Sequence, residues 1–262
     1  TVDKVDISKI GEKRVESRSA VSLAGTINFA VGTAVPYQLN ATATLDAIDA
    51  PRLFGAAGTG PDATFEGHWA VADTLTGDGA NLANLLARRQ DEYRFSSRNG
   101  VLRLLKADVA AAIPDRPTPG ADAAASVGHA VGWLFGVKEG PATNRVSKPM
   151  ESVLNFSYQI AELRYDEVHV TAVRRADGSV QLRDIAVVSP DEHVTGSGEI
   201  AQTASADFRN APLHLQLQLG VRGIAAERLA TAGLLSAKKD ALGYTLLREP
   251  VHFGGTLEHV DR

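Results

Sequence analysis

The sequence contains no cysteine, which excludes disulfide bonds and thiolate metal sites. It also lacks an apolar run approaching the roughly 20 residues that a membrane-spanning helix needs. The net charge is only −4, and neither lysine nor arginine gathers into a patch, so nothing favours a nucleic-acid partner. What is present is a chain of 262 residues that is 44% apolar, which is enough for a substantial core.

Motifs for catalysis are missing too. No G-x-S-x-G nucleophile elbow occurs, and the glycine-rich residues 55–60 lack the Lys-Ser/Thr that completes a phosphate loop. The seven histidines are scattered singly. His169 and His214 fall on the polar positions of alternating segments, and His193 falls in an expected turn. We therefore predict that the protein is not an enzyme and holds neither a metal nor a cofactor.

Residues 167–201 alternate between apolar and polar side chains, and they predict three antiparallel strands. Asp177-Gly178 supplies the positive φ angle that a tight hairpin turn requires. The segment 189–192, which contains Pro190, predicts the second turn. In the third strand, Gly196 and Gly198 permit a bulge or a close backbone approach.

The same alternation predicts strands at 21–31, 37–45, 65–71 and 251–257, with a glycine break at 77–79. The Asn99-Gly100 pair predicts a hairpin turn between strands 93–97 and 101–105. Short helices are expected near 46–54, with Asp49 as the cap, and at 81–89, 148–163 and 226–235. Residues 1–19 combine features of an edge strand and a solvated lead-in.

One row of leucines carries the functional signal of the sequence. Leu213, Leu215, Leu217 and Leu219 alternate with His214, Gln216 and Gln218, so all four leucines lie on one face of one strand. Two interpretations stay open. The row is ordinary core, or it faces an open groove and contacts acyl chains, since a large exposed apolar surface usually marks a binding site. These four residues are the candidate lipid contacts.

The fold expected from these patterns is α+β and mainly β. One or two curved antiparallel sheets form a groove, with short amphipathic helices packed on the concave side. We divide the chain into a β-rich unit at 1–106, an Ala/Pro/Gly-rich connection with a short helix at 107–149, and a helix followed by a β-meander at 150–262.

The stretch FEGHWAVADTLTGDGANLANLLARRQDEYRFSSRNGVLRLL at 65–105 resembles the AsmA-like (AsmA/TamB-type) family of bacterial envelope proteins. In that family a strand of the form v-x-G-x-f precedes a glycine-rich break, a short leucine helix and G-x-f-x-l-x-x-x-x-G-x-l-r. Residues 160–200 and 243–261 are similar to the C-terminal region of such proteins. The chain departs from the pattern where Asp91 or Glu92 replaces the family's glycine before the x-f-x-l strand.

This resemblance implies a periplasmic, non-catalytic segment of a longer protein with an inner-membrane anchor. Its curved β-groove would carry lipid or acyl chains between membranes or serve outer-membrane biogenesis. The absence of an initiator methionine fits a processed or shortened chain. An alternative of another class is a carbohydrate- or protein-binding β module, which needs exposed aromatics such as Trp69 and Trp133. A hydrolase would need clustered histidines and carboxylates.

Overall fold

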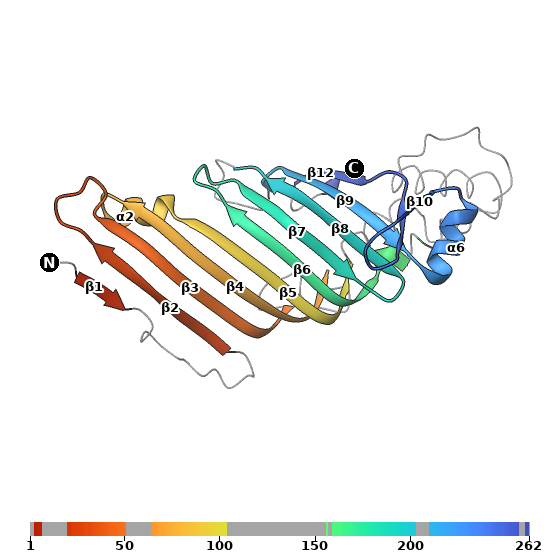
Figure 1. The fold of residues 1–262 in the computed structure, drawn as a ribbon, viewed down its shortest axis with the longest axis horizontal. Coiled ribbons are helices and arrows are strands. Elements are labelled where there is room, and N and C mark those ends of the chain that lie inside the picture. The colour runs from red at the N-terminus through yellow and green to blue at the C-terminus, as the bar shows by residue number, and fades with distance from the viewer. Residues whose placement is uncertain are drawn as a thin grey trace.

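The computed structural model describes residues 3–6, 20–50, 64–103, 156, 159–202, 210–256 and 260–261. They form one sheet of thirteen strands, drawn in Figure 1. The first nine strands lie side by side in chain order: β1 (Asp3–Asp6), β2 (Ala20–Phe29), β3 (Tyr37–Asp49), β4 (Phe65–Gly79), β5 (Gln90–Leu102), β6 (Leu163–Arg174), β7 (Val180–Val188), β8 (Glu192–Ile200) and β9 (Leu213–Val221). Every pairing in the sheet is antiparallel. The prediction of a mainly β, antiparallel fold is confirmed.

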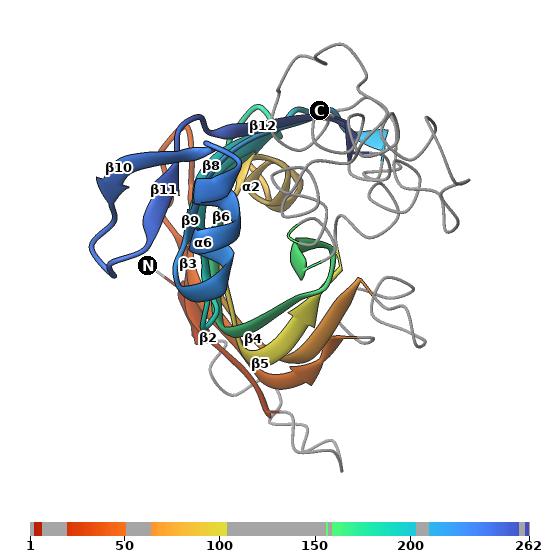
Figure 2. The ribbon, with the colours of Figure 1, turned by 90° about the vertical axis from the view of Figure 1, so that its right-hand side faces the viewer.

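The free edge of β9 pairs with two different strands, β11 (Thr245–Leu247) and β12 (Val251–Gly255), at different positions along its length. β11 pairs with one end of β9 and with β10 (Leu235–Lys239), while β12 pairs with the other end and with β13 (Val260–Asp261). The sheet does not close, because β1 and β10 are not paired with each other. It curls strongly, as Figure 2 shows when the molecule is viewed end-on.

The predicted meander at 167–201 is confirmed as β6, β7 and β8. Gly178 has a φ of 86°, the positive value expected for the turn between β6 and β7. Asp177 Oδ1 accepts hydrogen bonds from the backbone N of Ser179 at 2.9 Å and from its hydroxyl at 2.7 Å. The turn is therefore specified by its own residues.

The prediction of a hairpin at Asn99-Gly100 is wrong, because β5 continues through both residues. Asn99 has a φ of 54°, and together with Gly100 it forms a bulge opposite the single residue Gly67 on β4. A Cβ on Gly100 would lie 2.2 Å from the hydroxyl of Tyr165. The glycine thus makes room for a buried tyrosine of the neighbouring strand, instead of reversing the chain.

Strand ends also differ from prediction on β3 and β4. Residues 46–49, expected in a helix, belong to β3, where Asp46 and Ala47 form a bulge opposite Ala70. The break expected at 77–79 is not there, because β4 runs on to Gly79. A Cβ on Gly79 would lie 2.4 Å from the backbone N of Leu85, so the glycine lets a helix lie directly on the strand.

That helix is α2 (Leu82–Arg88), and the prediction of a helix at 81–89 is confirmed. Asn81 caps it by accepting a hydrogen bond from the backbone N of Asn84 at 2.9 Å. Leu85 is fully buried against Leu39 and Ala41 of β3. The second helix, α6 (Gly223–Thr231), begins and ends earlier than predicted, because Leu235 already belongs to β10.

Several predictions fall largely outside the described residues. They are the lead-in at 7–19, most of the helix at 46–54, the connection at 107–149 with its short helix, and most of the helix at 148–163, of which residues 156 and 159–161 are helical. Residues 3–6 form an edge strand, as one part of the prediction for 1–19 required. The division into three units stays a prediction, while β5 and β6 pair within one sheet.

Candidate functional site

The two faces of the sheet differ in chemistry from β2 to β7. Leu213, Leu215, Leu217 and Leu219 lie on the same face of β9, and we call it the leucine face; the opposite one is the polar face. The helices α2 and α6 pack on the leucine face, α2 through Leu85 and α6 through Leu229. The face is thus defined by residues that are far apart in the sequence.

A single cross-strand row of the leucine face is apolar over nine strands. Its members are Val21, Leu45, Val71, Phe95, Val170, Ile185, Gly196, Leu217 and Val251. Register pairs connect them except between β6 and β7, where a bulge sets Asp184 and Ile185 opposite Val170. We call this set the apolar row. Val71 and Val251 are buried, five of the other side chains are partly exposed, and Val21 is 43% exposed. The row therefore contacts solvent at several points and opens at its β2 end.

The next row on the leucine face is nearly as apolar and contains one charged residue. Its members are Leu23, Ala43, Asp73, Tyr93, Ala172, Leu182, Gly198, Leu215 and Phe253. By contrast, the neighbouring row of the polar face consists mostly of hydroxyl and basic residues: Ser22, Thr44, Ala72, Arg94, Thr171 and Arg183. A sheet with one apolar and one polar face needs a cover over the apolar one.

The four candidate lipid contacts lie together on the leucine face but in two environments. Leu213 is 3% and Leu219 is 4% exposed, so these two belong to closed core. Leu215 and Leu217 are partly exposed and lie in the two rows described above. Only the middle pair is therefore accessible enough to meet a ligand, and its role as a lipid contact stays a prediction.

Leu215 and Leu217 extend over glycines of the neighbouring strand. A Cβ on Gly198 would lie 2.4 Å from Leu215 Cδ2, and a Cβ on Gly196 would lie 2.6 Å from Leu217 Cδ2. The close approach that the sequence permitted at these glycines is thus present. It lets the leucines lie flat across β8 and widens the smooth apolar surface.

A cluster of charged residues interrupts this surface around Asp91 of β5. The Asp91 side chain is fully buried, and both of its oxygens accept hydrogen bonds from Arg89 Nε at 3.1 Å. Tyr93 donates its hydroxyl to Oδ2 at 3.0 Å, and Arg174 Nη1 lies 3.7 Å from the same oxygen. Asp91 is therefore well compensated for its burial.

Asp73 on β4 lies beside this cluster and is not compensated in the same way. It is only 9% exposed, and its Oδ1 has no hydrogen-bond partner in the part of the chain that the structure describes. Burial and the nearby Asp91 carboxylate raise the pKa of Asp73 to about 6, against the opposing effect of Arg89. A buried carboxylate with a free acceptor is costly, and its perturbed pKa makes Asp73 a candidate functional group.

Sequence analysis missed Asp73 and Asp91, although a signal was present. Asp73 is in phase with Trp69 and Val71, and Asp91 is in phase with Phe95, so both occupy positions that alternation assigns to the buried face. A charged residue in phase with a core row is the pattern that could have identified them.

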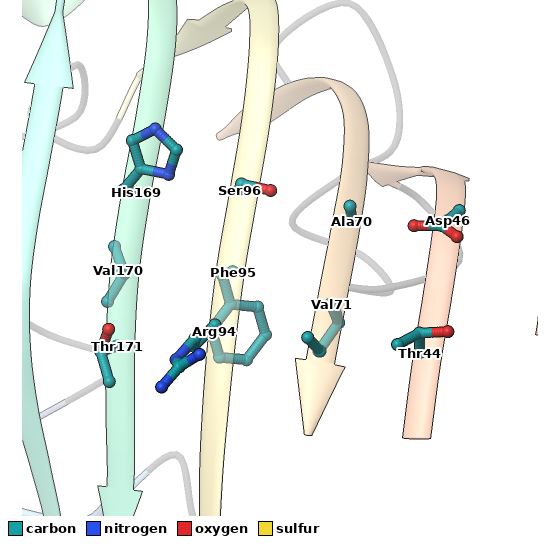
Figure 3. A pocket seen from close by; sticks show the side chains of 11 residues that line it. Thr44, Asp46, Ala70, Val71, Arg94, Phe95, Ser96, His169, Val170 and Thr171 are labelled. Carbon is teal, nitrogen blue, oxygen red and sulfur yellow. The ribbon is translucent and has the colours of Figure 1, made fainter. Parts of the chain in front are cut away.

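The polar face carries a pocket of about 240 Å³. Figure 3 shows that its residues come from β3, β4, β5 and β6. The polar-face side chains that line it are Thr44, Asp46, Ala70, Ala72, Arg94, Ser96, His169 and Thr171. His169 is exposed on the polar face, as predicted, and its Nε2 lies 2.9 Å from Glu167 Oε1 on the same strand. No aromatic ring of the polar face takes part, since Phe95 belongs to the apolar row.

The histidines within the described ranges do not gather into a site. His193 lies in β8 and not in a turn as expected, and its Nδ1 is 2.6 Å from Asp240 Oδ2. Asp240 Oδ1 also accepts from the backbone N of Leu242 and of Tyr244, so the pair holds the turn before β11. Burial raises the pKa of Asp240, but these hydrogen bonds outweigh it and leave that pKa below its usual value. Ser189 donates to Glu192 and not to His193, so these contacts contain no catalytic triad.

Comparison with known proteins finds no match for the chain among protein-family models, curated proteins or solved structures. Among the described residues, no helix combines the length and the apolar character needed to cross a membrane. Within the same residues, no three histidine, aspartate or glutamate side chains are grouped to hold a metal ion.

Proposed function

We propose that the protein handles lipid, with acyl chains lying against the leucine face. The observation that carries this proposal is the apolar row, which continues across nine strands while its central side chains stay partly exposed. An acyl chain is long, flexible and uniformly apolar, so it fits a continuous strip better than it fits a compact pocket. The apolar surface buried on both sides would drive binding.

The proposal places the leucine face and its short helices on the concave side of the curled sheet. Figure 2 supports this arrangement, because α2 lies within the curl. The contact of Leu85 with Leu39 and Ala41 fixes the side of the sheet on which α2 packs. The curl would then shield a bound chain from water on more than one side, while the polar face stays solvated.

We further propose that the chain is an AsmA-like segment of the bacterial envelope. It would be periplasmic, belong to a longer protein with an inner-membrane anchor, and serve outer-membrane biogenesis without catalysis. The support is the resemblance of residues 65–105, 160–200 and 243–261, together with the long, curled and unclosed antiparallel sheet. A hydrolase screen that found turnover abolished by His193→Ala would contradict the non-catalytic part.

A binding module is the second candidate, and the pocket beside Arg94 and His169 is the observation that favours it. A carbohydrate site would want an exposed aromatic platform, but Trp69 is buried and lies edge-on to Phe65 at a ring-centroid distance of 6.2 Å. The other tryptophan, Trp133, lies outside the described residues. The binding module therefore rests on one pocket over four strands, whereas lipid handling rests on an apolar row over nine strands.

Native mass spectrometry of the purified chain tests the proposed function. We expect adducts with the masses of phospholipids or fatty acids, which disappear after organic extraction of the protein. The chain should take up phospholipid again from vesicles. A folded chain that carries no amphiphile and extracts none from vesicles would contradict lipid handling.

A further inference from the structure

We propose that Asp73 is the headgroup-binding residue of the leucine face, and that it selects amphiphiles that carry an ammonium group. This inference rests on the proposed function, since the apolar row must hold the chain of the same amphiphile. It adds a ligand class, a long-chain alkylammonium, and a residue that recognises it.

The position of Asp73 fits a ligand whose chain lies along the sheet. Its register partners in the second row are Ala43 on β3 and Tyr93 on β5, and Val71 of the apolar row precedes it by two residues on the same strand. Leu23, the next residue beyond Ala43, is 37% exposed. Only the small Ala43 thus lies between Asp73 and Leu23 along the second row, and in this proposal the headgroup reaches the carboxylate from this side.

The charged groups around Asp73 explain why the ligand is a cation. Asp91 and Tyr93 face it from β5, Arg89 from the end of α2, and Arg174 reaches the cluster from β6. Both arginines and the tyrosine hydroxyl are directed at Asp91, so Asp91 is already neutralised. Asp73 is left as an acceptor with an unused, buried oxygen, for which an N–H⁺ donor is the complementary group.

Because Asp73 titrates, binding of the ammonium headgroup should depend on pH. The pKa of about 6 means that the carboxylate is mostly ionised at pH 7.5 and mostly protonated at pH 5. An alkylammonium keeps its charge over this range, as a lysine side chain does. The ion pair with the headgroup is therefore present at pH 7.5 and is lost as the pH falls through 6.

The test is calorimetric titration of the whole chain with dodecylammonium, dodecanol and dodecyl sulfate below their micellar concentrations. We expect dodecylammonium to bind about tenfold more tightly than dodecanol at pH 7.5, since a hydrogen bond to a charged group contributes at least this much. The preference should largely vanish at pH 5. Ethanolamine, an ammonium headgroup without a chain, should not bind measurably.

Asp73→Asn keeps the shape of the side chain and should remove the preference, leaving both amphiphiles with the affinity of dodecanol. Asp78→Asn, which removes an exposed carboxylate from the polar face of the same strand, should leave the preference unchanged. Thermal melts of both variants establish that they are folded.

Each alternative outcome has one meaning. If dodecanol binds but dodecylammonium gains nothing, or if the preference survives Asp73→Asn, the headgroup assignment is overturned and the lipid groove stands. A preference for dodecyl sulfate would assign Arg89 and Arg174 as the recognition groups and overturn it as well. Equal binding of ethanolamine and dodecylammonium would mean that the alkyl chain contributes nothing to affinity, which would contradict binding along the apolar row. If no long-chain compound binds, both proposals fail.

Discussion

Leu217 of β9 lies flat over Gly196, its register partner on β8, so that any Cβ at position 196 would meet Leu217 Cδ2 at 2.6 Å and the carbonyl oxygen of Gln216 at 2.3 Å. Gly196→Ala is therefore expected to push β8 and β9 apart and to lower the free energy of unfolding by about 1–3 kcal/mol. Urea denaturation measures this. Ser197→Ala, at an exposed polar-face neighbour, is the control and should change stability by less than about 0.5 kcal/mol. An equal, small effect of both variants would contradict the close contact.

The leucines of β9 should divide into two classes by stability. Leu219→Ala removes a buried side chain from the cluster around Leu229 and Phe253 and should destabilise by about 2–5 kcal/mol through lost burial and a cavity. Leu217→Ala should cost about 1 kcal/mol, because the site is partly solvated already. Chemical denaturation of both variants, with exposed Gln216→Ala as the reference, gives the comparison. A full core cost at Leu217 would mean that the apolar row is closed core.

The turn between β6 and β7 gives a local test of the fold. Gly178 has a φ of 86°, which a β-branched residue adopts only with strain. Gly178→Val should destabilise by about 1–3 kcal/mol. Gly178→Asn should cost less, because asparagine tolerates the left-handed region better than other side chains. If thermal melts gave the two variants the same midpoint as the parent, the turn would have another conformation.

Asp73 should make stability depend on pH in a predictable direction. Its folded pKa of about 6 lies above the ordinary value of 3.8, so between these values the folded state binds more protons than the unfolded state. Stability therefore falls as the pH rises from about 4 to 6, and the penalty is fully present above that range. A shift of this size corresponds to about 1–3 kcal/mol.

Asp73→Asn removes the titrating group, so the variant should gain stability over the parent at pH 7.5 and lose that advantage near pH 4. Urea midpoints of the two proteins at both pH values give the difference. Asp78→Asn serves again as the polar-face control. A difference between Asp73→Asn and the parent that does not change with pH would contradict the burial of an ionisable Asp73.

Local signals in the sequence predicted the parts of the fold that depend on neighbouring residues. The Asp177-Gly178 turn is predicted correctly, because Asp177 binds the backbone of Ser179 only two residues away. The helix at 81–89 is predicted as well, although Asn81, expected as its first residue, is its cap and accepts from the backbone N of Asn84. The hairpin prediction at Asn99-Gly100 is wrong because the conformation there depends on a residue of another strand. The glycine serves Tyr165, whose hydroxyl bonds to Ser97 Oγ and to the carbonyl oxygen of Glu66, both at 2.8 Å. The dipeptide Asn-Gly is compatible both with a hairpin turn and with a bulge that makes room for a tyrosine distant in sequence.

The candidate site was predictable only in part. Alternation placed Leu213, Leu215, Leu217 and Leu219 on one face, but it could not separate the buried pair from the accessible pair. Their burial depends on remote residues, since Leu219 packs with Leu229 of α6 and Leu213 packs with Ile200 and Ala211. The continuity of the apolar row from β6 to β7 depends on a bulge at Asp184, which has a positive φ. A one-residue slip there would exchange the faces of β7, so the row follows from a register that only the structure supplies.

The amount of lipid bound to Leu217→Asp, measured by native mass spectrometry after incubation with phospholipid vesicles, tests the lipid groove most directly. Gln216→Asp is the matched control, since it introduces the same charge one residue away on the exposed polar face. We predict that both variants are folded, that Gln216→Asp carries as much lipid as the parent, and that Leu217→Asp carries almost none, because a carboxylate in the apolar row must be desolvated by the chain. A folded Leu217→Asp variant with the lipid content of the parent would contradict an acyl-chain groove at the apolar row.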